Sequence, residues 1–131
     1  MPLMAAIAFS AALTQTHLGD VAEVPAHIQP MGWTYYGSTP RDYIFFQVHP
    51  QQPVFWIRAE SIASNDLKSR SYQWEVDCAS ERVRQVHTIL SSEHNLNQVE
   101  YIDAEDRDWQ YPNPEAVAGV ISDALCKAQG R

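Results

Sequence analysis

Basic residues and long apolar runs are both scarce in this chain. Nine Lys and Arg stand against sixteen Asp and Glu in 131 residues, which gives a formal net charge of −7 at pH 7. An acidic chain repels phosphate backbones, so a nucleic-acid partner is not expected. No stretch reaches the roughly 18 consecutive apolar residues that a membrane-spanning helix needs. We therefore expect no stable membrane span.

The common catalytic and metal-binding motifs are missing as well. The sequence contains no glycine-rich phosphate loop, no Gly-x-Ser-x-Gly elbow and no His-Glu-x-x-His helix. The acidic cluster within 100–108 lacks the glycine of a calcium loop, although a weak surface calcium site there stays open. We expect no enzyme activity, no catalytic residues, no cofactor and no metal. The five histidines show no compact ligand spacing and are His17, His27, His49, His87 and His94.

Only two cysteines are present, and each ends a different predicted element. Cys78 ends an alternating segment, and Cys126 ends a helical pattern over 114–127. One pair that joins a strand to a C-terminal helix indicates a structural disulfide, and hence an exported protein in an oxidising compartment. On an ideal helix, Cys126 lies about 150° from the centre of the apolar stripe. The helix must therefore unwind near Leu125, or Cys126 must reach around its end. A free cysteine nucleophile is disfavoured, because export would oxidise the thiol.

The N-terminal part of the chain predicts a segment separate from the folded domain. Residues 3–13 form a short apolar run that resembles the core of a secretory signal, although the first basic residue is Arg41. A packed N-terminal helix is the alternative. We predict a signal peptide or hydrophobic segment with the start of a linker over 1–24, and a single domain over 25–131. Residues 14–30 are predicted as a linker or loosely attached arm.

The remainder predicts an antiparallel meander. The segment 71–78 alternates between apolar and polar residues, which places its apolar members on the core side of a strand. Residues 43–48 are apolar at both parities, so we expect a central strand covered on both faces. Segment 81–90 fits a helix or a strand, and its β-branched residues favour a strand. Further strands are predicted at 33–36, 54–59 and 98–102, and a solvated acidic loop at 103–108.

The C-terminal segment predicts a helix on one face of this sheet. Asn113 is the expected N-cap, and Pro114 the first helical residue. Gly119 costs about 1 kcal/mol relative to alanine in a helix, which points to close packing there. The predicted fold class is α+β, an antiparallel β-sheet meander with a C-terminal α-helix and a strand-to-helix disulfide. The apolar stripe of the helix comprises Val117, Val120, Ile121, Ala124 and Leu125.

Aromatic residues are more numerous than one helix can cover. Because 43–48 and 54–59 are apolar on both sides, the N-terminal arm, a second protomer or a ligand should cover the surplus. We predict Tyr35, Tyr36 and Trp109 as exposed aromatic residues at a binding surface.

The order of these motifs resembles the surface-adhesin protein E family of small exported bacterial proteins. The likeness covers about residues 33–127. It is carried by the strand 74–78 with its cysteine, the Trp-x-x-Pro segment 109–112 and the helix that ends at Cys126. It implies a curved antiparallel sheet with a disulfide-tied helix, a location in the periplasm or at the cell surface of a gram-negative bacterium, and adhesion to host matrix proteins. A lipoprotein-type cysteine near the N-terminus and a lysine-rich segment are both lacking.

Taken together, these patterns predict an exported, disulfide-stabilised cell-envelope module that binds a protein partner or associates with itself. The alternative is a periplasmic small-ligand-binding module with an aromatic-lined pocket between sheet and helix. A flat aromatic patch on the sheet would favour the first function, and a pocket lined by Tyr and Trp the second.

Overall fold

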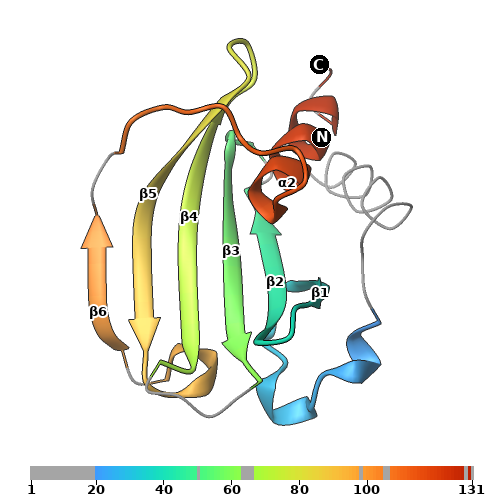
Figure 1. The fold of residues 1–131 in the computed structure, drawn as a ribbon, viewed down its shortest axis with the longest axis vertical. Coiled ribbons are helices and arrows are strands. Elements are labelled where there is room, and N and C mark those ends of the chain that lie inside the picture. The colour runs from blue at the N-terminus through green and yellow to red at the C-terminus, as the bar shows by residue number, and fades with distance from the viewer. Residues whose placement is uncertain are drawn as a thin grey trace.

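The computed structural model of the chain describes residues 20–49, 51–62, 67–97, 99–104, 107–128 and 130. They form a six-stranded antiparallel sheet in which every strand pairs with the next one along the chain, and the C-terminal helix lies against it (Figure 1). The predicted fold class is thereby confirmed. The elements are η1 (Val21–Glu23), η2 (Ala26–Ile28), β1 (Thr34–Ser38), β2 (Asp42–Val48), β3 (Val54–Ser61), β4 (Ser69–Asp77), β5 (Arg82–Ser91), η3 (His94–Leu96), β6 (Val99–Ala104) and α2 (Val117–Ala128).

The two faces of the sheet are covered by different parts of the chain. On one face, which we call the helix face, Phe46 and Phe55 pack against α2. On the other, which we call the arm face, Phe45 packs against Val24 and Ile28 from the N-terminal turns. Neighbouring residues on a strand point to opposite faces, so Phe45 and Phe46 pack into two separate hydrophobic cores. This explains why 43–48 is apolar at both parities.

The prediction of a loosely attached arm is wrong for the described residues from 20 to 30. Val24 and Ile28 are buried, and Gln29 Nε2 donates a hydrogen bond to the Val24 carbonyl at 2.7 Å. The predicted boundary between residues 24 and 25 falls inside this packed segment. Its two apolar side chains find a partner because β2 presents Phe45 on a face that α2 does not reach. The predicted signal segment, 3–13, lies outside the described residues.

The ambiguous segment 81–90 is strand β5, as its β-branched residues indicated. It pairs with β4 from Arg82 opposite Asp77 to Ser91 opposite Ser69, with one irregularity beside Gln73. Strand β6 continues to Ala104, so the predicted acidic loop begins later than expected. Residues 105 and 106 of the proposed calcium cluster lie outside the described residues.

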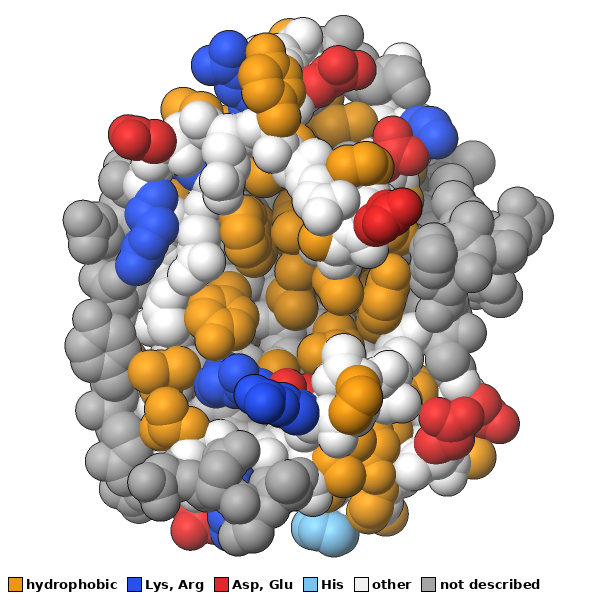
Figure 2. Space-filling model, viewed as in Figure 1, with side chains coloured by type: hydrophobic (Ala, Val, Ile, Leu, Met, Phe, Trp, Pro, Cys, Tyr) orange, Lys and Arg blue, Asp and Glu red, His pale blue; other side chains and the backbone are white. Residues whose placement is uncertain are grey.

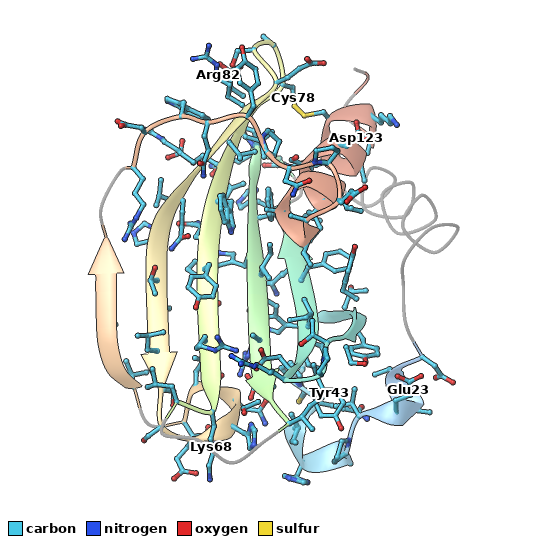
Figure 3. The ribbon with its side chains drawn as sticks, viewed as in Figure 1. Glu23, Tyr43, Lys68, Cys78, Arg82 and Asp123 are labelled. Atoms are coloured by element: carbon cyan, nitrogen blue, oxygen red, sulfur yellow. A yellow bond between two sulfur atoms is a disulfide. The ribbon has the colours of Figure 1, made fainter. Side chains whose placement is uncertain are left out.

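The disulfide between Cys78 and Cys126 closes without unwinding the helix. The Cα atoms are 5.6 Å apart, and α2 continues past Cys126 to Ala128. Neither expected adjustment, unwinding near Leu125 or a reach around the helix end, is needed, because α2 continues beyond Cys126 and Cys78 lies in the turn after β4, not on the predicted strand 71–78. From beyond the end of β4 it reaches the flank of the helix, where the bond is visible in Figure 3.

The helix begins at Val117, three residues later than predicted. Asn113 still organises the approach, because its side-chain Oδ1 accepts from the Glu115 amide and its carbonyl from the Ala116 amide, both at 3.0 Å. The chain before α2 folds back so closely on Gly119 that a Cβ atom there would collide with the Asn113 carbonyl. The close packing that the sequence suggested at Gly119 is confirmed.

Replacing Gly119 by alanine should therefore destabilise the protein. Alanine gains about 1 kcal/mol of helix propensity, but overpacking costs about 1–3 kcal/mol, and here the obstacle is backbone. We expect a net loss of about 1–2 kcal/mol in urea unfolding. Asp123→Ala, at an exposed position of α2, should change stability by no more than about 0.5 kcal/mol. A Gly119→Ala variant as stable as the parent would contradict the crowding described above.

Candidate functional site

The three aromatic residues predicted at a binding surface occupy three different environments. Tyr35 is only 5% exposed and packs against Tyr43 and Phe45, so its predicted exposure is wrong. The N-terminal arm covers it, and this burial raises the pKa of its hydroxyl. Tyr36 is half-buried on the helix face, where burial likewise raises its pKa. Trp109 is 36% exposed, as predicted.

Trp109 is held at the surface by a short strap beside β5. Gln110 exchanges two backbone hydrogen bonds with Val83, at 2.8 and 2.9 Å, which fixes the strap against the strand. Trp109 and Tyr111 therefore flank Arg84 and Arg82. The Arg84 guanidinium lies 4.6 Å from the centre of the Trp109 ring, and that of Arg82 lies 4.8 Å from the Tyr111 ring. Each aromatic ring is thus paired with a cation, a favourable contact even at exposed sites.

A further aromatic pair lies on the same face of the sheet. Trp56 of β3 and His87 of β5 stack with ring centres 6.3 Å apart, above Gln73 of β4. Strand register places Trp56, His87 and the two arginines on the arm face, at the end that residues 20–33 leave open. We call this surface the aromatic–arginine patch. It consists of Trp56, Arg82, Arg84, His87, Trp109 and Tyr111.

The covered end of the arm face contains a buried ionic cluster centred on Glu60, which is 0% exposed. One carboxylate oxygen accepts from Arg58 Nε at 2.7 Å and from the Ser69 hydroxyl. The other accepts from the Asn95 amide at 2.9 Å and lies 3.1 Å from His94 Nδ1. The cluster ties η3 to strands β3 and β4. Sequence reasoning missed it, because its members are distant in the chain.

On the helix face, hydrophobic side chains gather beside α2 in the middle of the sheet (Figure 2). The Trp74 indole stacks on Phe55 with ring centres 6.4 Å apart, and its buried Nε1 has no hydrogen-bond partner within the described residues. Nearby on this face, Arg70 and Asp42 form an ion pair at 2.5 Å. Burial opposes the charge on Arg70, but the contact with Asp42 outweighs it, so the pKa of Arg70 lies above its usual value.

Within the described residues, the structure shows no free thiol and no group of three or more metal-ligating side chains. Both cysteines are in the disulfide, so neither is free to act as a thiol nucleophile with a histidine such as His87 or His94 as its base. Among the described residues, no three or more His, Cys, Asp or Glu side chains are grouped to share a metal ion. None of the described helices is long and apolar enough to cross a membrane. In comparisons with known proteins, no family model matches the chain and no curated protein matches it.

Proposed function

We propose that this protein is an exported, non-enzymatic binding module of the bacterial cell envelope that engages a protein partner through the aromatic–arginine patch. The observation that carries the proposal is the patch itself, which exposes Trp109 and Tyr111 with arginines stacked on both rings. Trp, Tyr and Arg are the residues that dominate binding energy in protein interfaces. The disulfide is typical of exported proteins, and the likeness to the surface-adhesin protein E family supports an adhesin-like role.

The open position of the patch and the fixed conformation of its side chains favour a protein partner over a small molecule. Its residues lie along the open end of a sheet face and on the strap beside it, not between the sheet and the helix. Arg84 is held from two sides, by Trp109 and by Glu75 at 3.2 Å, so this part of the patch is ordered before any partner arrives. Ordering in advance reduces the conformational entropy lost on binding.

Substitutions in the patch should weaken binding to the partner. We expect Trp109→Ala and Arg84→Ala each to cost at least about 2 kcal/mol, a loss of about 30-fold in affinity. The measurement is biolayer interferometry of the purified chain and its variants against a panel of extracellular matrix proteins, with a second copy of the chain included. Met31→Ala is the matched control, because Met31 is 96% exposed and is not part of the patch. Unchanged binding by both patch variants would refute the proposal.

A second candidate function is the binding, on the helix face, of a small and largely apolar ligand that carries a hydrogen-bond acceptor. The unpartnered Nε1 of Trp74, beside the hydrophobic side chains of that face, is the specific observation in its favour. Screening small metabolites in the same assay separates the two functions. Trp74→Phe keeps an aromatic ring but removes the donor. A ligand that is lost with Trp74→Phe and retained with Trp109→Ala would establish the second function instead of the first.

A further inference from the structure

We propose that His27 and His94 together bind one divalent transition-metal ion of the type that imidazole prefers, such as zinc, copper or nickel. The proposal is independent of the aromatic–arginine patch, which lies at the other end of the arm face. His27 belongs to the η2 turn and His94 to η3, and their ring centres lie 6.3 Å apart in an edge-to-face contact. The fold thus brings together two histidines from distant parts of the sequence.

Glu60 prepares the His94 ring for metal binding. Its buried carboxylate lies 3.1 Å from His94 Nδ1, and a carboxylate can only accept, so Nδ1 carries the proton. The lone pair is then on Nε2, on the opposite side of a ring that is partly exposed to solvent. Metal-binding histidines in proteins regularly donate their second ring nitrogen to a carboxylate in this way, which fixes both the tautomer and the ring orientation.

Asn95 holds the two histidine-bearing segments together. Its side-chain Nδ2 donates to the His27 carbonyl at 2.9 Å, while its backbone amide donates to Glu60, also at 2.9 Å. The backbone positions of both histidines are therefore fixed relative to the same carboxylate. The His27 residue is exposed, so its ring can turn between staggered rotamers without disturbing a core.

The separation of the rings is compatible with one shared ion. Imidazole nitrogens bind such ions at about 2.0–2.1 Å, which keeps the centres of two rings on one ion within about 6.5 Å of each other. That limit applies to two nitrogens on opposite sides of the ion, whereas at the tetrahedral angle of a zinc site the ring centres lie about 5.2 Å apart. The His27 ring must therefore turn towards His94 to bring the observed 6.3 Å down to this distance.

The charges around the site permit a cation. The negative charge of Glu60 faces His94 and largely neutralises the positive charge of Arg58, whose Nε forms a 2.7 Å ion pair with the same carboxylate. This guanidinium also contacts the Asn95 side chain and the Trp33 ring. No third His, Cys, Asp or Glu joins the pair within the described residues, so water completes the coordination. The ion is therefore exchangeable, unlike the ion of a structural site with four protein ligands.

Calorimetric titration of the full chain with zinc chloride, and separately with nickel chloride, tests this site. We expect one ion per chain, and a loss of at least about 10- to 100-fold in affinity on removing either histidine, since the loss of even an outer-shell partner of a ligand costs that much. His27→Ala is at an exposed position. His94→Gln removes the imidazole but retains an amide that can donate to Glu60, so both variants should fold. His49→Ala is the matched control, since His49 is also exposed and lies at the end of β2.

Two outcomes would overturn the proposal. One is the absence of binding by the parent chain, and the other is binding that neither His27→Ala nor His94→Gln weakens more than His49→Ala does. Proton NMR provides a second readout on the same samples, because zinc should shift the ring C–H resonances of His27 and His94 and leave those of His87 in place. A shift confined to the other histidines would likewise exclude this pair as the site.

Discussion

Replacing both Cys78 and Cys126 by serine should lower the free energy of unfolding by about 4 kcal/mol. The two cysteines are 48 residues apart in sequence, so the bond removes a large closed loop from the conformations open to the unfolded chain. The chain-entropy treatment of such a loop gives this magnitude. Because domains of this size are stable by only about 5–15 kcal/mol, the loss is a large share of the total. Urea unfolding followed by tryptophan fluorescence measures it.

Reduction provides the control for this experiment. Dithiothreitol should shift the unfolding midpoint of the parent chain to that of the double serine variant, and it should leave the variant's own midpoint unchanged. Mass spectrometry of the parent chain before and after reduction should show a gain of two hydrogens. Coinciding midpoints for the oxidised parent and the variant would mean that the bond does not stabilise the fold.

Truncating Glu60 to alanine should be comparably damaging, with an expected loss of about 3–5 kcal/mol. The substitution leaves Arg58, which is only 5% exposed, as a buried charge without its anion. It also removes the acceptor for the buried Ser69 hydroxyl and for the partly buried Asn95 amide. Urea unfolding at neutral pH measures the effect.

Two further variants show whether burial is the cause. Glu75→Ala breaks the ion pair between Glu75 of β4 and Arg84 of β5, which also lies on the arm face. Both side chains are partly exposed, so we expect the free energy of unfolding to fall by at most about 1 kcal/mol. In the double variant Arg58→Met with Glu60→Leu, the buried charge is gone, and stability should recover relative to Glu60→Ala. Equal losses for Glu60→Ala and Glu75→Ala would contradict this explanation.

Much of the fold was predictable because it depends on local patterns. Alternation identified β4, and apolar residues at both parities of β2 indicated two covered faces, which Phe45 and Phe46 occupy. The disulfide partners followed from their positions at the ends of two elements. The start of α2 was misplaced, because Pro114 and Asn113 form a turn ahead of the helix instead of its first residues.

The surface was harder to predict, because exposure depends on which distant segment covers a residue. Tyr35 and Trp109 were both predicted to be exposed, but the arm covers only Tyr35. To predict the patch around Trp109, one would have to know that Gln110 pairs with Val83, and no periodicity in the sequence reveals this pairing. The cluster of Glu60 with His94 depends likewise on the way η3 folds back under the sheet. The alternation of Arg58 and Glu60 within an otherwise apolar strand was the one local signal of it.

The position of the disulfide also has a mechanical consequence. A pull on the two ends of the folded chain would pass along β1 to β4 and then cross directly from Cys78 to Cys126. The intervening segment, residues 79–125, whose full extension would add roughly 160 Å, lies outside this path. That segment carries the strap and every member of the aromatic–arginine patch except Trp56. In a protein tethered at one end and held at the other, the backbone that carries most of this surface would thus not be extended by the load.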